Sequence, residues 1–153
     1  MIKHTGPWVG VMLHHSAGTI KDNVSSMRNY HIYKKHWGDI GYHYVLEIKN
    51  GRGYLKAGRS LNFAGAHAGV NKYNQKYIGL CLPGNYSLDH ISKGLYEDLL
   101  GAICTIMKKN NCYGFCGHRE VKNTECPGKK IHLDKIREDL SAKLGREVKF
   151  IKL

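Results

Sequence analysis

The sequence predicts a single α/β domain in which helices flank a central mixed β-sheet. Its length of 153 residues suits one domain. Residues 9–13 and 77–82 are short apolar runs of the length expected for buried strands, whereas residues 89–109 and 134–144 repeat apolar side chains at helical spacing. Because strands and helices follow one another along the chain, one sheet covered by helices is the favoured arrangement.

The first predicted strand ends in two histidines. Residues 9–13 are apolar and rich in branched side chains, and the strand they form delivers His14 and His15 at its C-terminal end. Residues 16–23 are expected to be a loop. Residues 25 to about 36 contain good helix formers and precede a glycine, so we predict a helix there.

A hairpin and a long loop are predicted next. Residues 42–48 alternate between two sides, with Tyr42 at the start of the strand. The sequence Lys49-Asn50-Gly51 is typical of a tight hairpin turn, and residues 54–56 return as a short strand. Residues 58–76 are rich in Gly, Ala and Asn, which indicates a long surface loop of the kind that is often functional.

The second half of the chain contributes two strands and two helices. Residues 77–82 form an apolar strand that ends at a Pro-Gly turn, and residues 89–109 form the longest helix. Residues 113–116 are expected to be a short strand that leads into His118. The last helix, 134–144, carries one apolar stripe and stops at a glycine.

The chain is strongly basic, with a formal net charge of +12 before its ten histidines are counted. This charge favours anionic partners such as nucleic acid, a membrane surface or an acidic wall polymer, and it equally fits a merely solvated surface. No apolar run approaches ~18 residues, so we expect no membrane insertion. The first residues lack the apolar segment of a secretory signal, so we expect synthesis in the cytoplasm.

His118 and Cys126 lie eight positions apart in a loop that Pro127-Gly128 closes. Imidazole nitrogen and thiolate sulfur are ligand types that zinc favours. A third ligand must come from elsewhere, and the best donors are His14 and His15, of which only one can face the metal because consecutive strand residues point to opposite faces.

Five cysteines leave an alternative open. Cys112 and Cys116 precede His118 and Cys126 at a spacing that would allow a closed Cys3His structural zinc site. In the simpler interpretation, the cysteines at positions 81, 104, 112 and 116 are small buried apolar residues rather than a disulfide framework.

Four blocks of sequence occur in an order that resembles one family: residues 13–18 (LHHSAG), 39–44 (DIGYHY), 67–69 (HAG) and 118–128 (HREVKNTECPG). They are similar to the zinc-dependent N-acetylmuramoyl-L-alanine amidases of the amidase-2 type, which include small phage endolysins and the peptidoglycan recognition proteins. The resemblance covers residues 9 to about 144, so we expect an amidase-like core and no separate cell-wall-binding domain.

The resemblance implies a catalytic zinc ion bound by His14, His118 and Cys126, with one corner left open. It assigns Tyr42 to the active site, where its phenol would hydrogen-bond the attacking water or the oxyanion. Thr124 occupies a position where relatives carry lysine or threonine, and its hydroxyl would donate to the oxyanion. The resemblance leaves Lys122 out of register with that position.

Three further residues are expected in the substrate groove. The resemblance places His67 there, Asn74 with a loop that is about two residues longer than in relatives, and Arg59 as a weaker candidate. Some relatives carry a glutamate as general base on the strand that here contains Cys81, so the proton acceptor stays open between Tyr42 and the zinc hydroxide.

The expected function is a hydrolase that cuts the amide between the lactyl group of N-acetylmuramic acid and L-alanine of the stem peptide. A phage or prophage endolysin fits best: it would wait in the host cytoplasm, act on the wall after release, and adsorb to anionic wall polymers. A peptidoglycan-binding module without catalysis is the second hypothesis. A nucleic-acid binder is the third, and no recognisable motif supports it.

Overall fold

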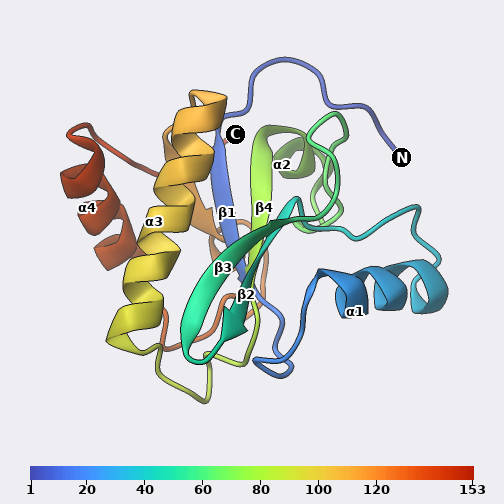
Figure 1. Cartoon of the computed structure of the whole chain (residues 1–153). Coiled ribbons are helices and arrows are strands. Elements are labelled where there is room, and N and C mark those ends of the chain that lie inside the picture. Colours follow the sequence, from blue (N-terminus) through green and yellow to red (C-terminus); the bar gives the residue numbers. More distant parts are fainter.

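The computed structural model describes all residues from 1 to 153 and confirms the predicted fold class (Figure 1). A five-stranded sheet has the order β3-β2-β4-β1-β5. β1 pairs in parallel with both β4 and β5, β2 is parallel to β4, and β3 is antiparallel to β2. The strands are β1 (Gly10–His15), β2 (Tyr44–Lys49), β3 (Arg52–Ala57), β4 (Tyr77–Leu82) and β5 (Gly114–Gly117).

Helices cover both faces of this mixed sheet. Figure 1 shows α3 and α4 on one side and α1 and α2 on the other. Alternate residues of β1 enter the two layers: Val11 and Leu13 join the core beneath α3 and α4, whereas Met12 packs towards α2. The helices are α1 (Val24–Asn29), η1 (Tyr30–Lys34), α2 (Asn71–Lys76), α3 (Lys93–Asn110), η2 (His118–Glu120) and α4 (Leu133–Leu144).

Several boundaries differ from the predicted ones. β2 begins two residues after Tyr42, which lies between two bends before the strand. The predicted loop 58–76 contains α2, a single short helix without a side-chain cap. α3 starts at Lys93 rather than at residue 89, because the Ser92 hydroxyl caps it by accepting a hydrogen bond from the backbone N–H of Leu95.

The folded body extends beyond the predicted core of residues 9–144. Lys3 forms a β-bridge with Phe63, and Lys149 forms one with Gly114. The backbone N–H of Ile151 donates to the Tyr77 hydroxyl, which itself donates to the Ile151 carbonyl. Both ends of the chain are therefore part of the domain.

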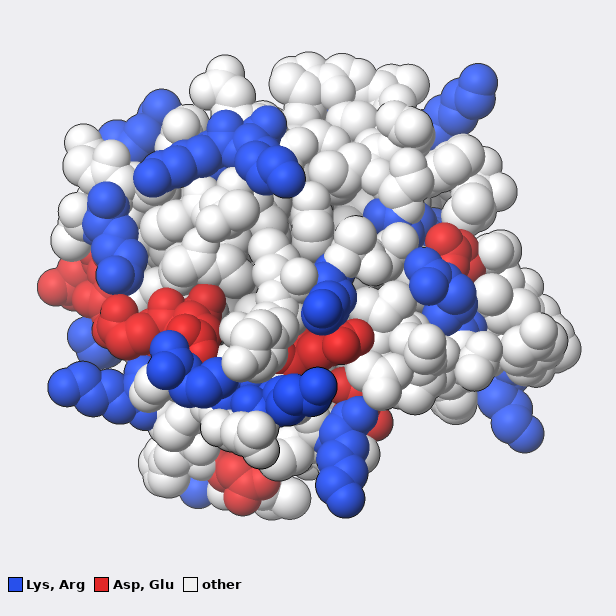
Figure 2. Space-filling view, viewed as in Figure 1, with Lys and Arg blue, Asp and Glu red and all other residues white.

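The surface charge is dispersed. Figure 2 shows Lys and Arg side chains scattered over one face, with Asp and Glu side chains mainly in its lower half. None of the helices has the length and apolar content that crossing a membrane requires.

The parallel strands β1, β4 and β5 all end at the same edge of the sheet. Residues that follow these strands meet at that edge, as is common for the sites of α/β proteins. β1 ends at His15 and β5 at Gly117, immediately before His118.

Candidate metal centre

Three side chains from separate parts of the chain converge at this edge. His14 lies in β1, His118 is the first residue of η2, and Cys126 lies in the loop that follows. One donor atom of each lies within 4.8 Å of those of the other two. The Nδ1 atom of His14 is 3.6 Å from Sγ of Cys126, a residue 112 positions away.

Backbone carbonyls determine which nitrogen of each histidine carries its proton. Nε2 of His118 lies 2.8 Å from the Ala68 carbonyl oxygen, which can only accept, so this nitrogen holds the hydrogen and Nδ1 keeps its lone pair. Nε2 of His67 likewise donates to the Tyr77 carbonyl at 3.1 Å. Nδ1 of His67 then accepts from Nε2 of His14 at 2.8 Å, which leaves the His14 Nδ1 lone pair facing Cys126.

Burial keeps the two histidine ligands neutral. It lowers the pKa of His14 well below the usual value, and the neighbouring His67 and His118 lower it further. Burial also lowers the pKa of His118. Neutral imidazoles are the form that binds a metal, so neither ligand has to lose a proton before it coordinates one.

The cysteine ligand behaves differently. Burial raises the pKa of the Cys126 thiol to about 11, although the backbone N–H of His15 and the charge of Arg119 oppose this rise. That N–H lies 3.4 Å from Sγ and would stabilise the thiolate. A divalent cation favours the thiolate far more strongly, so metal binding and loss of the thiol proton are coupled.

The donor set fits zinc. It offers two imidazole nitrogens and one sulfur, and no fourth His, Cys, Asp or Glu belongs to the group. Zinc prefers four ligands in tetrahedral geometry, so three protein donors leave one corner for water or substrate. This is the arrangement of catalytic rather than structural zinc sites.

His15 is not part of this group. Its ring is on the other face of β1, where Nδ1 accepts a hydrogen bond from the Tyr86 backbone N–H at 3.1 Å. Strand alternation thus separates the two neighbouring histidines, as expected.

The alternative Cys3His site is excluded by the positions of its cysteines. Cys112 packs in the main hydrophobic core and Cys116 in the cluster beneath α2. Burial raises the pKa of Cys112 to about 11. All five cysteines are free thiols.

His67 supports His14 from the second layer of residues around the metal centre. Its side chain is only 8% exposed, and both ring nitrogens are used in the hydrogen bonds described above. The ring fits against β4 because residue 79 is a glycine: a Cβ atom there would lie 2.5 Å from Cδ2 of His67. Gly65 makes room in the same way, at 2.3 Å. The structure thus gives His67 a position that supports His14, and its expected contact with substrate stays a prediction.

Asn74 and Arg59 are also committed to the protein's own backbone. Oδ1 of Asn74 accepts from the N–H groups of His67 and Ala68, at 3.0 and 2.8 Å, and so holds the loop that carries both residues. Arg59 is 5% exposed and donates to three backbone carbonyls. Both border a cavity of about 260 Å³ beside Trp37. The Arg59 guanidinium is used in its backbone hydrogen bonds, whereas Nδ2 of Asn74 forms no hydrogen bond within the protein.

Tyr42 lies beside the metal centre. Its ring centroid is 5.2 Å from that of His14. Burial raises the pKa of the phenol well above its usual value, and the neighbouring Cys81 and Cys126 raise it further. Tyr42 therefore keeps its proton at neutral pH and can act as a hydrogen-bond donor.

Cys81 does not replace the glutamate found in some relatives. It is fully buried in β4, and burial raises its pKa well above the usual value. A neutral, buried thiol cannot accept a proton from water, so Cys81 is not a general base.

Two side chains of the 118–126 loop lie close to the ligands. The Thr124 hydroxyl accepts from the Cys126 backbone N–H at 3.3 Å, which leaves its own hydrogen free to donate. Lys122 passes over Gly69, where a Cβ atom would lie 2.2 Å from its ammonium nitrogen, and its charge lowers the pKa of His118. Lys122 is exposed, and its charge still acts on the metal centre.

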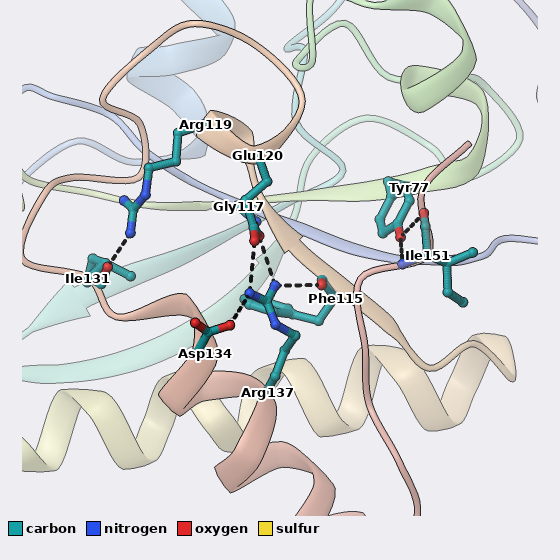
Figure 3. Close-up of polar contacts among 9 residues, drawn as sticks. All are labelled: Tyr77, Phe115, Gly117, Arg119, Glu120, Ile131, Asp134, Arg137 and Ile151. Atoms are coloured by element: carbon teal, nitrogen blue, oxygen red, sulfur yellow. Dashed lines mark hydrogen bonds and ion pairs between the residues drawn. The ribbon is translucent and has the colours of Figure 1, made fainter.

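A polar network holds the turn that carries His118 (Figure 3). Arg137 of α4 forms two hydrogen bonds of 2.8 Å with the Glu120 carboxylate. Glu120 in turn accepts from the Gly117 backbone N–H at 2.9 Å. Arg119 donates to the carbonyls of Gly128 and Ile131, which fixes the segment that follows Cys126.

The fold and this centre together define the class of the chain: a single α/β domain with a His-His-Cys metal-binding group of the three-donor kind. The sequence model of the family described as N-acetylmuramoyl-L-alanine amidase (Amidase_2) matches residues 4–129. The chain therefore belongs to this family.

Relatives of known sequence are recognition proteins and amidases. Peptidoglycan-recognition protein LB of Drosophila melanogaster is 33% identical over 137 residues, covering 82% of this chain and 57% of that protein. Human N-acetylmuramoyl-L-alanine amidase is 29% identical over 110 residues, covering 69% of this chain and 18% of its own length. The chain thus spans little more than half of the first relative.

Solved structures show the same fold. The amidase LysC from Clostridium intestinale URNW superposes with a TM-score of 0.76 at 24% identity, covering 96% of this chain and 95% of its own. A mutant of Drosophila PGRP-LB in complex with tracheal cytotoxin superposes with a TM-score of 0.73 at 28% identity, covering 88% of this chain and 82% of its own.

Proposed function

We propose that this chain is a zinc-dependent N-acetylmuramoyl-L-alanine amidase that hydrolyses the amide between the lactyl group of N-acetylmuramic acid and L-alanine of the stem peptide. The convergence of His14, His118 and Cys126, with one corner open, carries the proposal. When bound, zinc acts as a Lewis acid that makes water nucleophilic near neutral pH and polarises the amide carbonyl. Family membership supports this substrate.

The side chains around the ligands have separate tasks in this mechanism. Tyr42 keeps its proton and donates a hydrogen bond to the amide oxygen as that oxygen gains negative charge. Thr124 has a hydroxyl hydrogen free to donate to the same oxygen, and the charge of Lys122, which acts on the neighbouring His118, adds positive potential at the site. His67 and the Ala68 carbonyl hold the two imidazole ligands in their binding tautomers.

A binding module without catalysis is the competing function, because several relatives are peptidoglycan recognition proteins. One such relative was solved with tracheal cytotoxin, which supports a muropeptide ligand for either function. The presence of the Cys126 thiol and the protonated Tyr42 beside His14 favours catalysis.

Mass spectrometry of digested peptidoglycan tests the proposal. Zinc-loaded protein should release stem peptides with a free L-alanine amino group and leave muramic acid with a free lactyl carboxylate. Cleavage within the peptide or the glycan would contradict it. Retained binding of muropeptide without any cleavage would instead establish the recognition function.

The biological setting is a separate proposal. We propose a phage or prophage endolysin that acts on the bacterial wall after release from the host cytoplasm. The net charge of +12 would favour adsorption to anionic wall polymers. Neither nucleic-acid binding nor membrane insertion has a part in this mechanism.

A further inference from the structure

A second cavity, unrelated to the metal ligands, lies between the first turns of α3 and α4. Its volume is about 310 Å³, within the range of small-molecule sites. None of the metal ligands or their supporting residues lines it. We call it the lysine cavity, and its lining consists of His90, Ile91, Lys93, Tyr96, Lys130, Ile131, His132, Lys135 and Ile136.

The lysine cavity is positively charged. Three lysines and two histidines line it, together with no carboxylate. Lys135 is paired with Asp139 at 3.1 Å. Lys93 and Lys130 form no ion pair, and the ammonium of Lys130 is held by a hydrogen bond of 2.8 Å to the Leu88 carbonyl. Two positive charges are therefore available to an incoming anion.

The two helices increase this positive potential. Both begin at the cavity, since Lys93 is the first residue of α3 and Lys135 and Ile136 lie in the first turn of α4. α4 has no side-chain cap at its start, so backbone N–H groups of its first turn are free of such a partner. The positive ends of two helix dipoles thus add to the lysine charges.

Part of the cavity lining is apolar. Ile91, Ile131 and Ile136 line it together with the ring of Tyr96, whose hydroxyl is turned away to donate to Asp139 at 2.6 Å. A small inorganic anion would leave this apolar surface uncovered. This combination of lysines and apolar side chains suits a ligand in which an anionic group lies next to a compact carbon skeleton.

We propose that the lysine cavity binds a repeat unit of an anionic polyol-phosphate polymer, with the phosphate between Lys93 and Lys130 and the polyol carbons against the isoleucines. Lysines suit this ligand because their ammonium groups act as point charges that approach a phosphate from several sides. A nucleic-acid strand fits less well, because the lining offers no arginine and its aromatic rings are one half-buried tyrosine and two exposed histidines.

This site goes beyond the proposed reaction, since it does not depend on amide cleavage. A wall that carries such a polymer would be held at two places, the lysine cavity and the metal centre. A protein that binds a surface through two linked sites stays bound longer, even when the affinity of each separate site is unchanged.

Titration of the isotope-labelled full chain, followed by NMR at low salt, tests the proposal. The probes are poly(glycerol phosphate), sn-glycerol 3-phosphate and inorganic phosphate, with glycerol as the neutral control. The polymer and the monomer should shift the amide signals of Lys93, Ile131 and Lys135 in a saturable way. Inorganic phosphate should bind more weakly, because it lacks the carbon skeleton.

Two double variants that remove the same charge separate a site from general attraction. Lys93→Gln with Lys130→Gln should raise the Kd for the polymer by at least about tenfold, because two charge-assisted contacts are lost. Lys108→Gln with Lys109→Gln, at the opposite end of α3, should change it less than about twofold. The single variant Lys93→Gln keeps the hydrogen bond from Lys130 to the Leu88 carbonyl, so it should fold normally. It should still bind the polymer more weakly, which shows that the loss in the double variant is not a folding defect.

Three results would overturn the proposal. The first is an equal loss of binding in both double variants, which would indicate attraction by net charge. The second is a set of shifted signals outside the lysine cavity. The third is a single-stranded oligonucleotide that binds as tightly as the polymer with the same dependence on Lys93, which would assign the cavity to nucleic acid.

Discussion

The two halves of the sheet differ in burial and in what they hold. Every residue of β1, β4 and β5 is buried, whereas β3 alternates between exposed and half-buried positions. The parallel half places two of the three metal ligands at its edge, and the β2–β3 hairpin places none. Ligands thus lie where the backbone is packed on both sides.

The two halves of the sheet meet where β2 pairs with β4, and we call this short junction the seam. β2 pairs with β4 only at Tyr44 and Val45. Just before it, His43 extends the pairing: its N–H donates to the Gly79 carbonyl at 3.0 Å, and its Nδ1 accepts from the Gly79 N–H at 3.1 Å. The hairpin therefore contributes to the site through Tyr42 and His43 at its root, and its tip contributes little.

The largest effect should follow from loss of a ligand in the parallel half. Cys126→Ser or His14→Ala should reduce zinc affinity by more than about a hundredfold, the upper value for a supporting residue, and abolish amide hydrolysis. Competition with a chromophoric chelator measures the affinity. Cys104→Ala, a cysteine on α3, is the control and should leave zinc affinity unchanged. An active, zinc-binding Cys126→Ser protein would remove Cys126 from the ligand set.

The seam should make the protein acid-sensitive. Burial lowers the pKa of His43 to about 4, so between about pH 6.5 and 4 the unfolded chain binds more protons than the folded one. The free energy of unfolding therefore has its full value above about pH 6.5. It should fall by about 3 kcal/mol as the pH approaches 4. Urea unfolding of metal-free protein across this range measures it.

His43→Gln tests whether this residue is the cause. The variant should be less stable at pH 7.5 and lose less stability on acidification, whereas His132→Gln, at an exposed position, should behave like the parent. An unchanged pH dependence in His43→Gln would assign the acid sensitivity to other buried histidines.

A supporting residue within the parallel half should have an intermediate effect. His67→Phe removes the acceptor for His14 Nε2, so zinc affinity should fall about 10- to 100-fold while the fold persists. His67→Asn offers a carbonyl oxygen near the position of Nδ1 and should recover part of the loss. Equal affinities for the two variants would show that the hydrogen bond to His14 does not matter.

The smallest effects come from two arginine ion pairs, one in each half. The Arg137 side chain is 14% exposed and bridges α4 to Glu120. The Arg52 side chain, in the β2–β3 hairpin, is 60% exposed and pairs with Asp98 of α3. Arg137→Gln should lower the free energy of unfolding by about 1–2 kcal/mol, after allowance for solvent screening, and weaken zinc binding through the His118 turn. Arg52→Gln should leave both unchanged. Similar losses in the two variants would contradict the contrast between the halves.

Sequence reasoning found the three residues of the metal-binding group but not the residue that supports them. His14, His118 and Cys126 could be predicted because their residue types suit a metal and their blocks occur in a known order. The role of His67 could not, because its partner is 53 positions away and its burial depends on Gly65 and Gly79 packing against it. The run of small residues around His67 was the only local signal of a close approach.

The fold was predicted well where packing and periodicity agree. β1 and β4 are fully buried and read as apolar runs, and the stripes of α3 and α4 mark the helices that cover them. α2 was missed because its six residues include two asparagines and lack a cap. The start of β2 was misplaced because the alternation of Tyr42 continues through a bend that only tertiary contacts define.

The neutral, hydrogen-bonded state of the two histidines determines how many protons the protein donors release when the site binds a metal ion. Both imidazole ligands already present a lone pair, so an arriving ion displaces hydrogen from sulfur alone. The protein donors would thus liberate a single equivalent of acid on metal loading, and ionisation of a metal-bound water near its pKa of about 7 would add to it. Burial sets that count by keeping both imidazoles neutral, and the distant Tyr77 carbonyl selects the nitrogen of His14 that meets the ion.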